Sequence, residues 1–91
     1  MRIQLSEAAT KYHGERKKTA VVNIPGKGRI ELALSDTARC ARMPDAARRT
    51  IVNLAGGEDV FDGEDDIVVA AAALHQHCRA LMGIQDEARR K

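Results

Sequence analysis

Aromatic side chains are almost absent from this chain, which has one Tyr, one Phe and no Trp among 91 residues, a share of 2%. A core without large rings must be built from aliphatic residues and alanines, each of which buries little area. Because a chain of this length also buries only about 60–65% of its unfolded surface, we expect a low stability. Such a core favours support from a partner or a second copy.

Cysteines and long apolar runs are also scarce. The two cysteines, Cys40 and Cys78, are too few for a disulfide scaffold, and we expect free thiols in a reducing compartment. No segment approaches the roughly 20 apolar residues of a membrane helix, and the N-terminal segment lacks the apolar stretch of a signal peptide. These absences predict a cytoplasmic protein without a membrane partner.

Charge is unevenly distributed along a chain whose formal net charge is only +2. Residues 1–49 carry eleven Lys or Arg against five Asp or Glu, and residues 50–91 carry four against eight, which makes +6 and −4. The basic half suits an acidic protein surface or nucleic acid, and the acidic half can mask it or pair with a second copy. The alternative interpretation is two solvated faces. With 44% hydrophobic and 31% charged residues, the composition predicts one small folded domain over residues 1–91.

A β-hairpin is the clearest local prediction, because two segments alternate polar and apolar residues. The apolar sets are Ala20, Val22 and Ile24, and Ile30, Leu32 and Leu34. Burial of both sets on one face predicts Ile24 opposite Ile30, with 26–28 as a three-residue loop and Gly28 at positive φ.

The segment before this hairpin is ambiguous. Residues 2–5 predict a short strand, which allows a third strand in the sheet. Residues 6–12 fit either a short helix capped by Ser6 or a longer strand. Residues 14–18 are interpreted as a charged connector.

Three helices are predicted after the hairpin. Residues 37–42, capped by Ser35 or Asp36, and a helix from Pro44 to Leu54 or Ala55 meet at Met43. The second of these buries one stripe and leaves two arginines outward; the predicted buried residues are Ala47, Ile51, Leu54 and Ala55.

The longest apolar run predicts the main helix, which is capped by Asp62 and reaches about Met82. Its predicted buried stripe is Ile67, Ala71, Leu74, Cys78 and Leu81, widened by Ala70, Ala73, His77 and Ile84. The fold class is therefore α+β: an antiparallel hairpin packed against a long C-terminal helix, with two short helices between them. Residues 85–91 are expected to be a frayed tail.

Catalytic and cofactor signatures are absent from the sequence. His75 and Cys78 are three residues apart on a helix, but no Cys-x-x-Cys partner accompanies them, so Cys78 is expected to be a core residue. The acidic segment does not have the spacing of a calcium-binding EF-hand loop. We therefore expect neither an enzyme, nor a metal, nor a cofactor.

Two charged surfaces are the candidate binding sites. The basic one lies on the two short helices and comprises Arg39, Arg42, Arg48 and Arg49. The acidic one surrounds the start of the main helix and comprises Asp62, Glu64, Asp65 and Asp66.

These surfaces predict a non-enzymatic regulator or inhibitor that acts by protein–protein contact, in one concrete form an anti-CRISPR-like inhibitor of a host protein–nucleic acid complex. A helix-turn-helix-like DNA-binding regulator that uses Arg48 and Arg49 as a dimer is the first alternative, although the turn at Arg42 departs from the usual pattern. A self-assembling structural subunit is the second.

Overall fold

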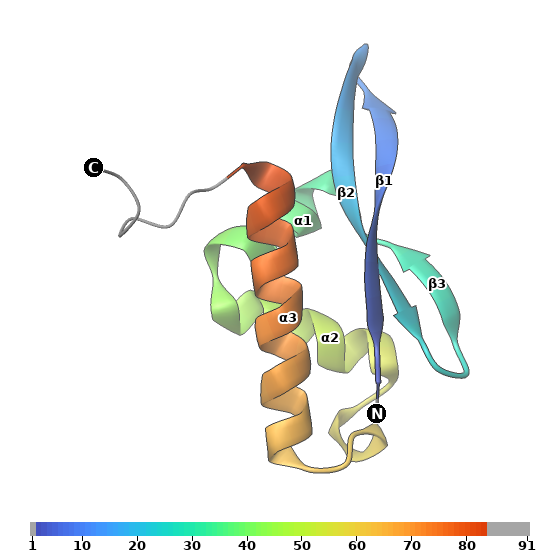
Figure 1. The fold of residues 1–91 in the computed structure, drawn as a ribbon, viewed down its shortest axis with the longest axis vertical. Helices are drawn as coiled ribbons and strands as arrows, with labels where there is room; N and C mark the ends of the chain where they lie inside the picture. The colour runs from blue at the N-terminus through green and yellow to red at the C-terminus, as the bar shows by residue number, and fades with distance from the viewer. Residues whose placement is uncertain (1, 84–91) are drawn as a thin grey trace.

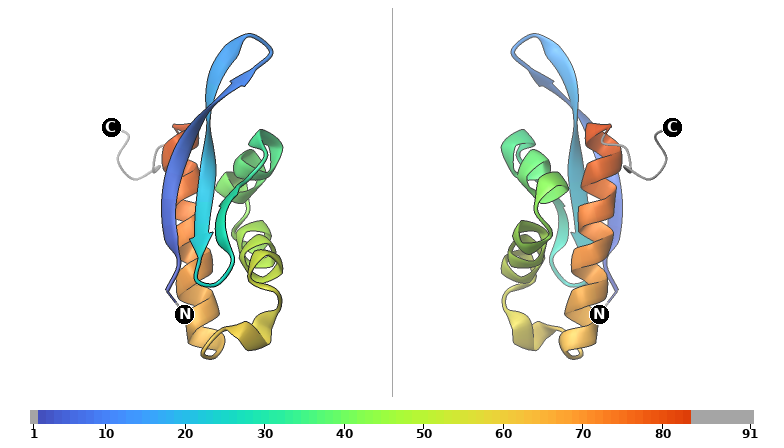
Figure 2. Two further views of the ribbon diagram at one scale, coloured as in Figure 1. Left: turned by 90° about the vertical axis from the view of Figure 1, so that its right-hand side faces the viewer. Right: turned by 90° about the vertical axis from the view of Figure 1, so that its left-hand side faces the viewer.

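The computed structural model describes residues 2–83. They form a three-stranded antiparallel sheet in the order β1-β2-β3, with all three helices on one of its faces (Figures 1 and 2). The α+β class, with a long last helix, agrees with the sequence prediction. The elements are β1 (Gln4–Tyr12), β2 (Glu15–Ile24), β3 (Gly28–Glu31), α1 (Leu34–Arg42), α2 (Pro44–Ala55), a 3-10 turn η1 (Glu58–Val60) and α3 (Glu64–Met82).

Strands β1 and β2 form a long hairpin, which includes the segment 6–12 that fitted either a helix or a strand. Residues 6–12 are a strand, and residues 15–18 continue β2, so the interpretation of 14–18 as a connector was wrong. The register runs from Gln4 opposite Asn23 to Tyr12 opposite Glu15. The two turn residues, His13 and Gly14, both have positive φ, 50° and 82°, as the tightest hairpin turns require. No apolar alternation marks the end of this hairpin because both of its faces meet solvent there.

The register of β2 and β3 differs from the prediction by two residues. Ile24 lies opposite Gly28, and Val22 lies opposite Ile30. The turn causes the shift: Lys27 donates its backbone N–H to the Ile24 carbonyl at 2.9 Å, and Gly26 has φ 84°, as in a type II turn that begins with proline. Because the shift is even, the apolar residues stay on the predicted face. Gly28 has the expected positive φ, 90°.

Helices α1 and α2 meet at Met43, whose extended backbone separates them as predicted. Neither Ser35 nor Asp36 caps α1, which starts earlier than expected with Ala33 at its N-cap position. The bounds of α2 were predicted correctly, and Gly56 ends it with φ 105°. On α2 the buried set differs from the prediction at two positions: Leu54 is only partly buried, and Ala46 is buried.

Helix α3 packs across the same face of the sheet and contacts α1, α2 and β2. Asp62 does not cap it; the N-cap residue is Gly63, and the Asp62 backbone N–H donates to the Asp66 carboxylate at 3.1 Å. No helix among residues 2–83 has the length and hydropathy needed to cross a bilayer.

The buried side of α3 largely follows the predicted stripe. Ile67, Ala71, Leu74 and Cys78 are buried, and Ala70 joins them, whereas Leu81 and His77 are partly buried and Ala73 is exposed. Gly83, at φ 74°, ends the helix. The predictions for Ile84 and for residues 85–91 lie outside the described residues.

Candidate functional site: a basic arm and the hollow at its base

The basic surface predicted on the two short helices is partly neutralised. Arg48 reaches the first turn of α3, where its guanidinium lies 2.7 Å from the Glu64 carboxylate and 3.6 Å from that of Glu58. The hydrogen bond with Glu64 raises the pKa of Arg48. Arg39 pairs with Asp36 at 3.0 Å on its own helix. Only the two remaining members of this surface, Arg42 and Arg49, are exposed cations without an ion pair within residues 2–83.

Two carboxylates of the acidic surface also make contacts within the molecule. Glu64 binds Arg48, and the Asp66 carboxylate accepts the backbone N–H of Asp62. Asp65 is exposed. The two halves of opposite charge therefore meet at α2 and α3.

The arrangement of α1 and α2 departs from a helix-turn-helix. A single residue, Met43, separates the two helices, whereas the motif uses a turn of about three to four residues. Arg48, which the DNA-binding hypothesis needs in the groove, is held by α3. The geometry thus gives this hypothesis no support.

The histidines and cysteines of α3 link it to its neighbours. His75 donates from Nδ1 to the Cys40 carbonyl at 2.8 Å, and His77 donates from Nε2 to the Ser6 carbonyl at 2.6 Å. Cys40 and Cys78 are both fully buried free thiols. Within residues 2–83 there is no group of three or more His, Cys, Asp or Glu side chains with metal-binding geometry.

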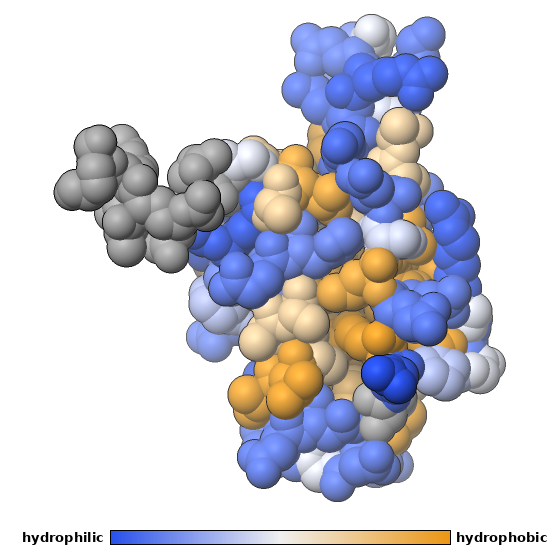
Figure 3. All heavy atoms as spheres, in the orientation of Figure 1, coloured by the Kyte–Doolittle hydropathy of each residue, from blue (hydrophilic) through white to orange (hydrophobic). Residues whose placement is uncertain are grey.

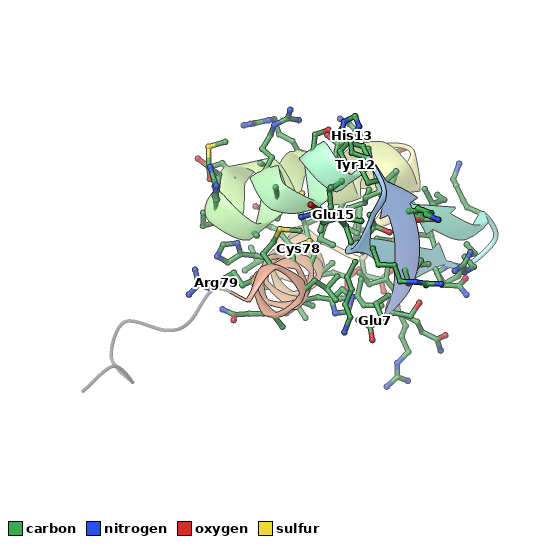
Figure 4. All side chains as sticks on the ribbon, turned by 90° about the horizontal axis from the view of Figure 1, so that it is seen from above. Glu7, Tyr12, His13, Glu15, Cys78 and Arg79 are labelled. Carbon is green, nitrogen blue, oxygen red and sulfur yellow. The ribbon has the colours of Figure 1, made fainter. Side chains whose placement is uncertain are left out.

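The two buried thiols are close enough to interact with each other. A hydrogen bond with Cys78 lowers the pKa of Cys40, and the same contact together with burial raises the pKa of Cys78. Figure 4 shows Cys78 on the side of α3 that faces the other helices. Since neither thiol is accessible, their position indicates packing.

A surface that the sequence did not reveal stands out in the fold. The end of the β1–β2 hairpin projects beyond the helices (Figure 1), and its side chains form a hydrophilic tip (Figure 3). We call residues 11–18 the basic arm. Every residue in it is exposed, and it contains four Lys or Arg and one Glu. At its turn, the rings of Tyr12 and His13 meet edge to face with centroids 4.4 Å apart (Figure 4).

Like charges face each other across the basic arm. Lys11 is paired directly with Arg16, and Lys18 lies two residues further along the same face. Like charges opposite each other destabilise a pair of strands. Within residues 2–83, Lys11 and Arg16 form no ion pair with a carboxylate, while Lys18 pairs with Glu7 at 3.3 Å in an exposed, weak contact. This face is therefore a ready binding surface for anions.

A hollow of about 440 Å³ lies where the basic arm meets the helices, and we call it the arm-base hollow. Its apolar floor comes from two helices, with Leu34 and Ala38 on α1 and Leu81 and Met82 on α3. Cationic side chains line its other side; they are Arg16, Lys17 and Lys18. An apolar floor beside three cations suits an apolar side chain flanked by carboxylates.

The sequence carried only a weak signal for this surface. A turn residue, Gly14, separates two polar segments, and no apolar alternation identifies either of them as a strand. The floor of the hollow joins residues more than 40 positions apart, Leu34 and Leu81 among them. Comparison with known protein families, with curated proteins and with solved structures gives no match.

Proposed function

We propose that this protein is a non-enzymatic regulator or inhibitor that acts by binding another protein, and that the basic arm and the arm-base hollow form its contact surface. The partner presents an acidic segment that also carries an apolar side chain. The unfavourable pairing of Lys11 with Arg16 is the observation that carries the proposal. Local rules of stability are commonly broken where a surface serves binding, and an acidic partner relieves this repulsion.

The arm-base hollow favours a protein partner over nucleic acid. A two-stranded ribbon of basic residues also fits the major groove of DNA. Phosphates, however, gain nothing from an apolar floor such as Leu34 and Met82 provide. A protein segment uses both parts of the surface, with an apolar anchor in the hollow and carboxylates against the cations at the rim.

The experiment compares affinity captures from the native cell with three baits: the natural protein, an arm variant (Lys11→Glu/Arg16→Glu) and a helix variant (Arg42→Glu/Arg49→Glu). The two variants change the net charge equally and alter only exposed side chains. We expect a stoichiometric protein partner that the helix variant retains and the arm variant loses. A fourth bait, Ala38→Gln, fills part of the hollow without changing charge and should also lose the partner.

If only the helix variant loses the partner, the contact surface lies on α1 and α2 and not on the basic arm. Fluorescence anisotropy with random duplex DNA tests the nucleic-acid alternative. The partner is DNA if the protein binds the duplex at moderate salt, if this binding falls steeply with added salt, and if the arm variant does not bind. Circular dichroism of each variant verifies that it is folded.

A further inference from the structure

Strand β3 stops short of the basic arm, so one edge of β2 has no neighbouring strand there. The last residue of β3, Glu31, lies opposite Val21, whereas β2 begins at Glu15 and pairs with β1 from that residue on. After β3 the chain turns into α1, which begins at Leu34. Figure 1 shows that β3 ends well below the tip of the β1–β2 hairpin. Within residues 2–83, residues 15–18 of β2 therefore have a strand on one side only.

The open edge of β2 carries backbone groups that can pair with a further strand. Both backbone groups of Ala20 point to the β3 side: the carbonyl accepts from the Leu32 N–H at 2.9 Å, and the N–H donates to the Thr37 hydroxyl at 3.2 Å. Alternate residues of an antiparallel strand present their backbone groups to the same side. The N–H and carbonyl groups of Lys18 and Arg16 therefore point to the side where no described strand lies. Such an edge is a template for β-strand addition.

Hollows lie on both faces of the sheet beside the open edge. The arm-base hollow, on the helix face, is lined by Arg16 and Lys18 of the edge itself. A second one, of about 460 Å³, lies on the opposite face, and we call it the open-face hollow. It is lined by Thr10 and Tyr12 of β1, Thr19 of β2 and residues 31–34. Leu34 lines both hollows, which therefore flank the place that a continuation of β3 would occupy. Because the side chains of a strand alternate between the two faces of a sheet, each set of side chains would meet one hollow.

The helix face of the open edge attracts carboxylates. Arg16 has no ion pair within residues 2–83, and Lys18 makes only an exposed contact with Glu7 at 3.3 Å. A second copy of this edge would set the same cations opposite each other, which destabilises the pairing of strands. The charges therefore favour a different chain that carries acidic side chains.

The open face of the same edge suits uncharged side chains, because its charges already have partners. Glu31 accepts hydrogen bonds from the hydroxyl groups of Thr10 and Thr19. Lys17 lies 2.9 Å from the Glu15 carboxylate. A further charge on this face would gain no unpaired group of opposite sign among these residues, so the two faces of the edge select different side chains.

We infer that the acidic segment of the partner binds as an added β-strand on the open edge of β2, in line with β3. Its backbone bonds to the N–H and carbonyl groups of Arg16 and Lys18. Its carboxylates and one apolar side chain, at every second position, face the arm-base hollow, and the uncharged residues between them face the open-face hollow. This binding mode rests on the proposed function and adds the conformation and the side-chain pattern of the recognised segment. In strand addition the main-chain bonds supply affinity and the alternate pockets supply specificity.

Two synthetic peptides of the same composition test the strand pairing. In the first, Thr alternates with Glu, Leu and Glu; in the second, the Glu and Leu residues are adjacent, so carboxylates fall on both faces of an extended chain. Nuclear magnetic resonance titration of the natural protein measures both dissociation constants. We expect the alternating peptide to bind at least about 10-fold more tightly and to slow hydrogen exchange of the Arg16 and Lys18 amides. The Lys17 amide, which points to β1, is the internal control and should not change.

Two substitutions at one position separate the backbone from the charge. Lys18→Gln removes only the charge. Lys18→Pro removes the charge and the outward N–H, and proline is tolerated in an edge strand where the N–H faces outward. We expect Lys18→Pro to bind the alternating peptide about 10-fold more weakly than Lys18→Gln does. Circular dichroism verifies that both variants are folded.

The outcomes distinguish this binding mode from the proposed function. Absence of binding by the alternating peptide, equal binding of the two peptides, or unchanged exchange of the Arg16 and Lys18 amides overturns strand addition. In that case, loss of the captured partner by the arm variant still supports the proposed function, because charge alone then carries the contact. If the arm variant instead keeps its partner, the proposed function fails whatever the peptides do.

Discussion

The substitution Thr37→Val should destabilise the protein although it makes the core more hydrophobic. Thr37 is fully buried on α1. Its hydroxyl accepts the backbone N–H of Ala20 at 3.2 Å and donates to the Ala33 carbonyl at 3.0 Å. The Ala20 carbonyl still accepts from the Leu32 N–H at 2.9 Å, but β3 ends at Glu31 and the chain turns away. The Thr37 hydroxyl therefore takes the place of the β3 carbonyl that would otherwise accept the Ala20 N–H.

The expected loss in the free energy of unfolding depends on which groups the valine or serine side chain leaves without a contact. Valine has nearly the shape of threonine, so it creates no cavity, but it leaves the buried Ala20 N–H without an acceptor, at a cost of about 1–3 kcal/mol. Thr37→Ser keeps the hydroxyl and loses one methyl group, at about 0.8 kcal/mol. A loss of about 2 kcal/mol lowers the melting temperature of a domain of this size by roughly 8–16 °C.

Urea denaturation of the natural chain and both variants measures these differences, and hydrogen exchange of the Ala20 amide locates them. We expect the stability order natural, Thr37→Ser, Thr37→Val, with faster exchange at Ala20 in the valine variant. If Thr37→Val is as stable as the natural chain, or more stable than Thr37→Ser, then the buried Ala20 N–H does not depend on the Thr37 hydroxyl as its acceptor.

Three further predictions concern the sheet, the basic arm and the thiols. Hydrogen bonds from Thr10 and Thr19 lower the pKa of Glu31 below its ordinary value of 4.5. The stability that these bonds contribute is therefore present above pH 4.5 and is lost as the pH falls through the lower pKa of the folded state. In thermal melts across pH, Glu31→Gln should be less stable than the natural chain at about pH 7 and equally stable in acid. Lys11→Glu, which turns a like-charge pair into an opposite one, should raise the free energy of unfolding by up to about 1 kcal/mol while weakening partner capture, and a fall in stability would contradict the strand register. Both cysteines should resist an alkylating reagent until the protein unfolds, and rapid labelling of the native protein would show that their burial is wrong.

The basic arm links stability to the proposed binding. An isolated two-stranded hairpin is marginally stable in water, and this one pairs Lys11 with Arg16 in its exposed end. The proposed partner would offset the repulsion within this pair through its own carboxylates. Since the chain has few aromatic residues and a thin core, the cost of keeping such a pair is a large share of its total stability.

Prediction succeeded where a few neighbouring residues decide the outcome. Pro44 and Gly56 set the bounds of α2, because proline suits a first helical position and glycine the left-handed residue after the last. It failed where several neighbouring residues can take the same role. The first turn of α3 was expected to be capped by Asp62, but Gly63 takes that position while Asp66 binds the Asp62 N–H. Similarly, the Pro-Gly turn moved β3 by two residues.

The bounds of α2, the apolar faces and the α+β class could be predicted from the sequence, because they follow from periodicity and turn chemistry within short segments. Which charges are paired and which remain on the surface depends on how the elements pack. Arg48, predicted as a contact residue, meets Glu64 from a different helix, whereas Lys11 and Arg16, in a segment interpreted as partly connector, became the basic arm. Pairing of charges depends on distances between segments far apart in the chain, and no local pattern records those distances.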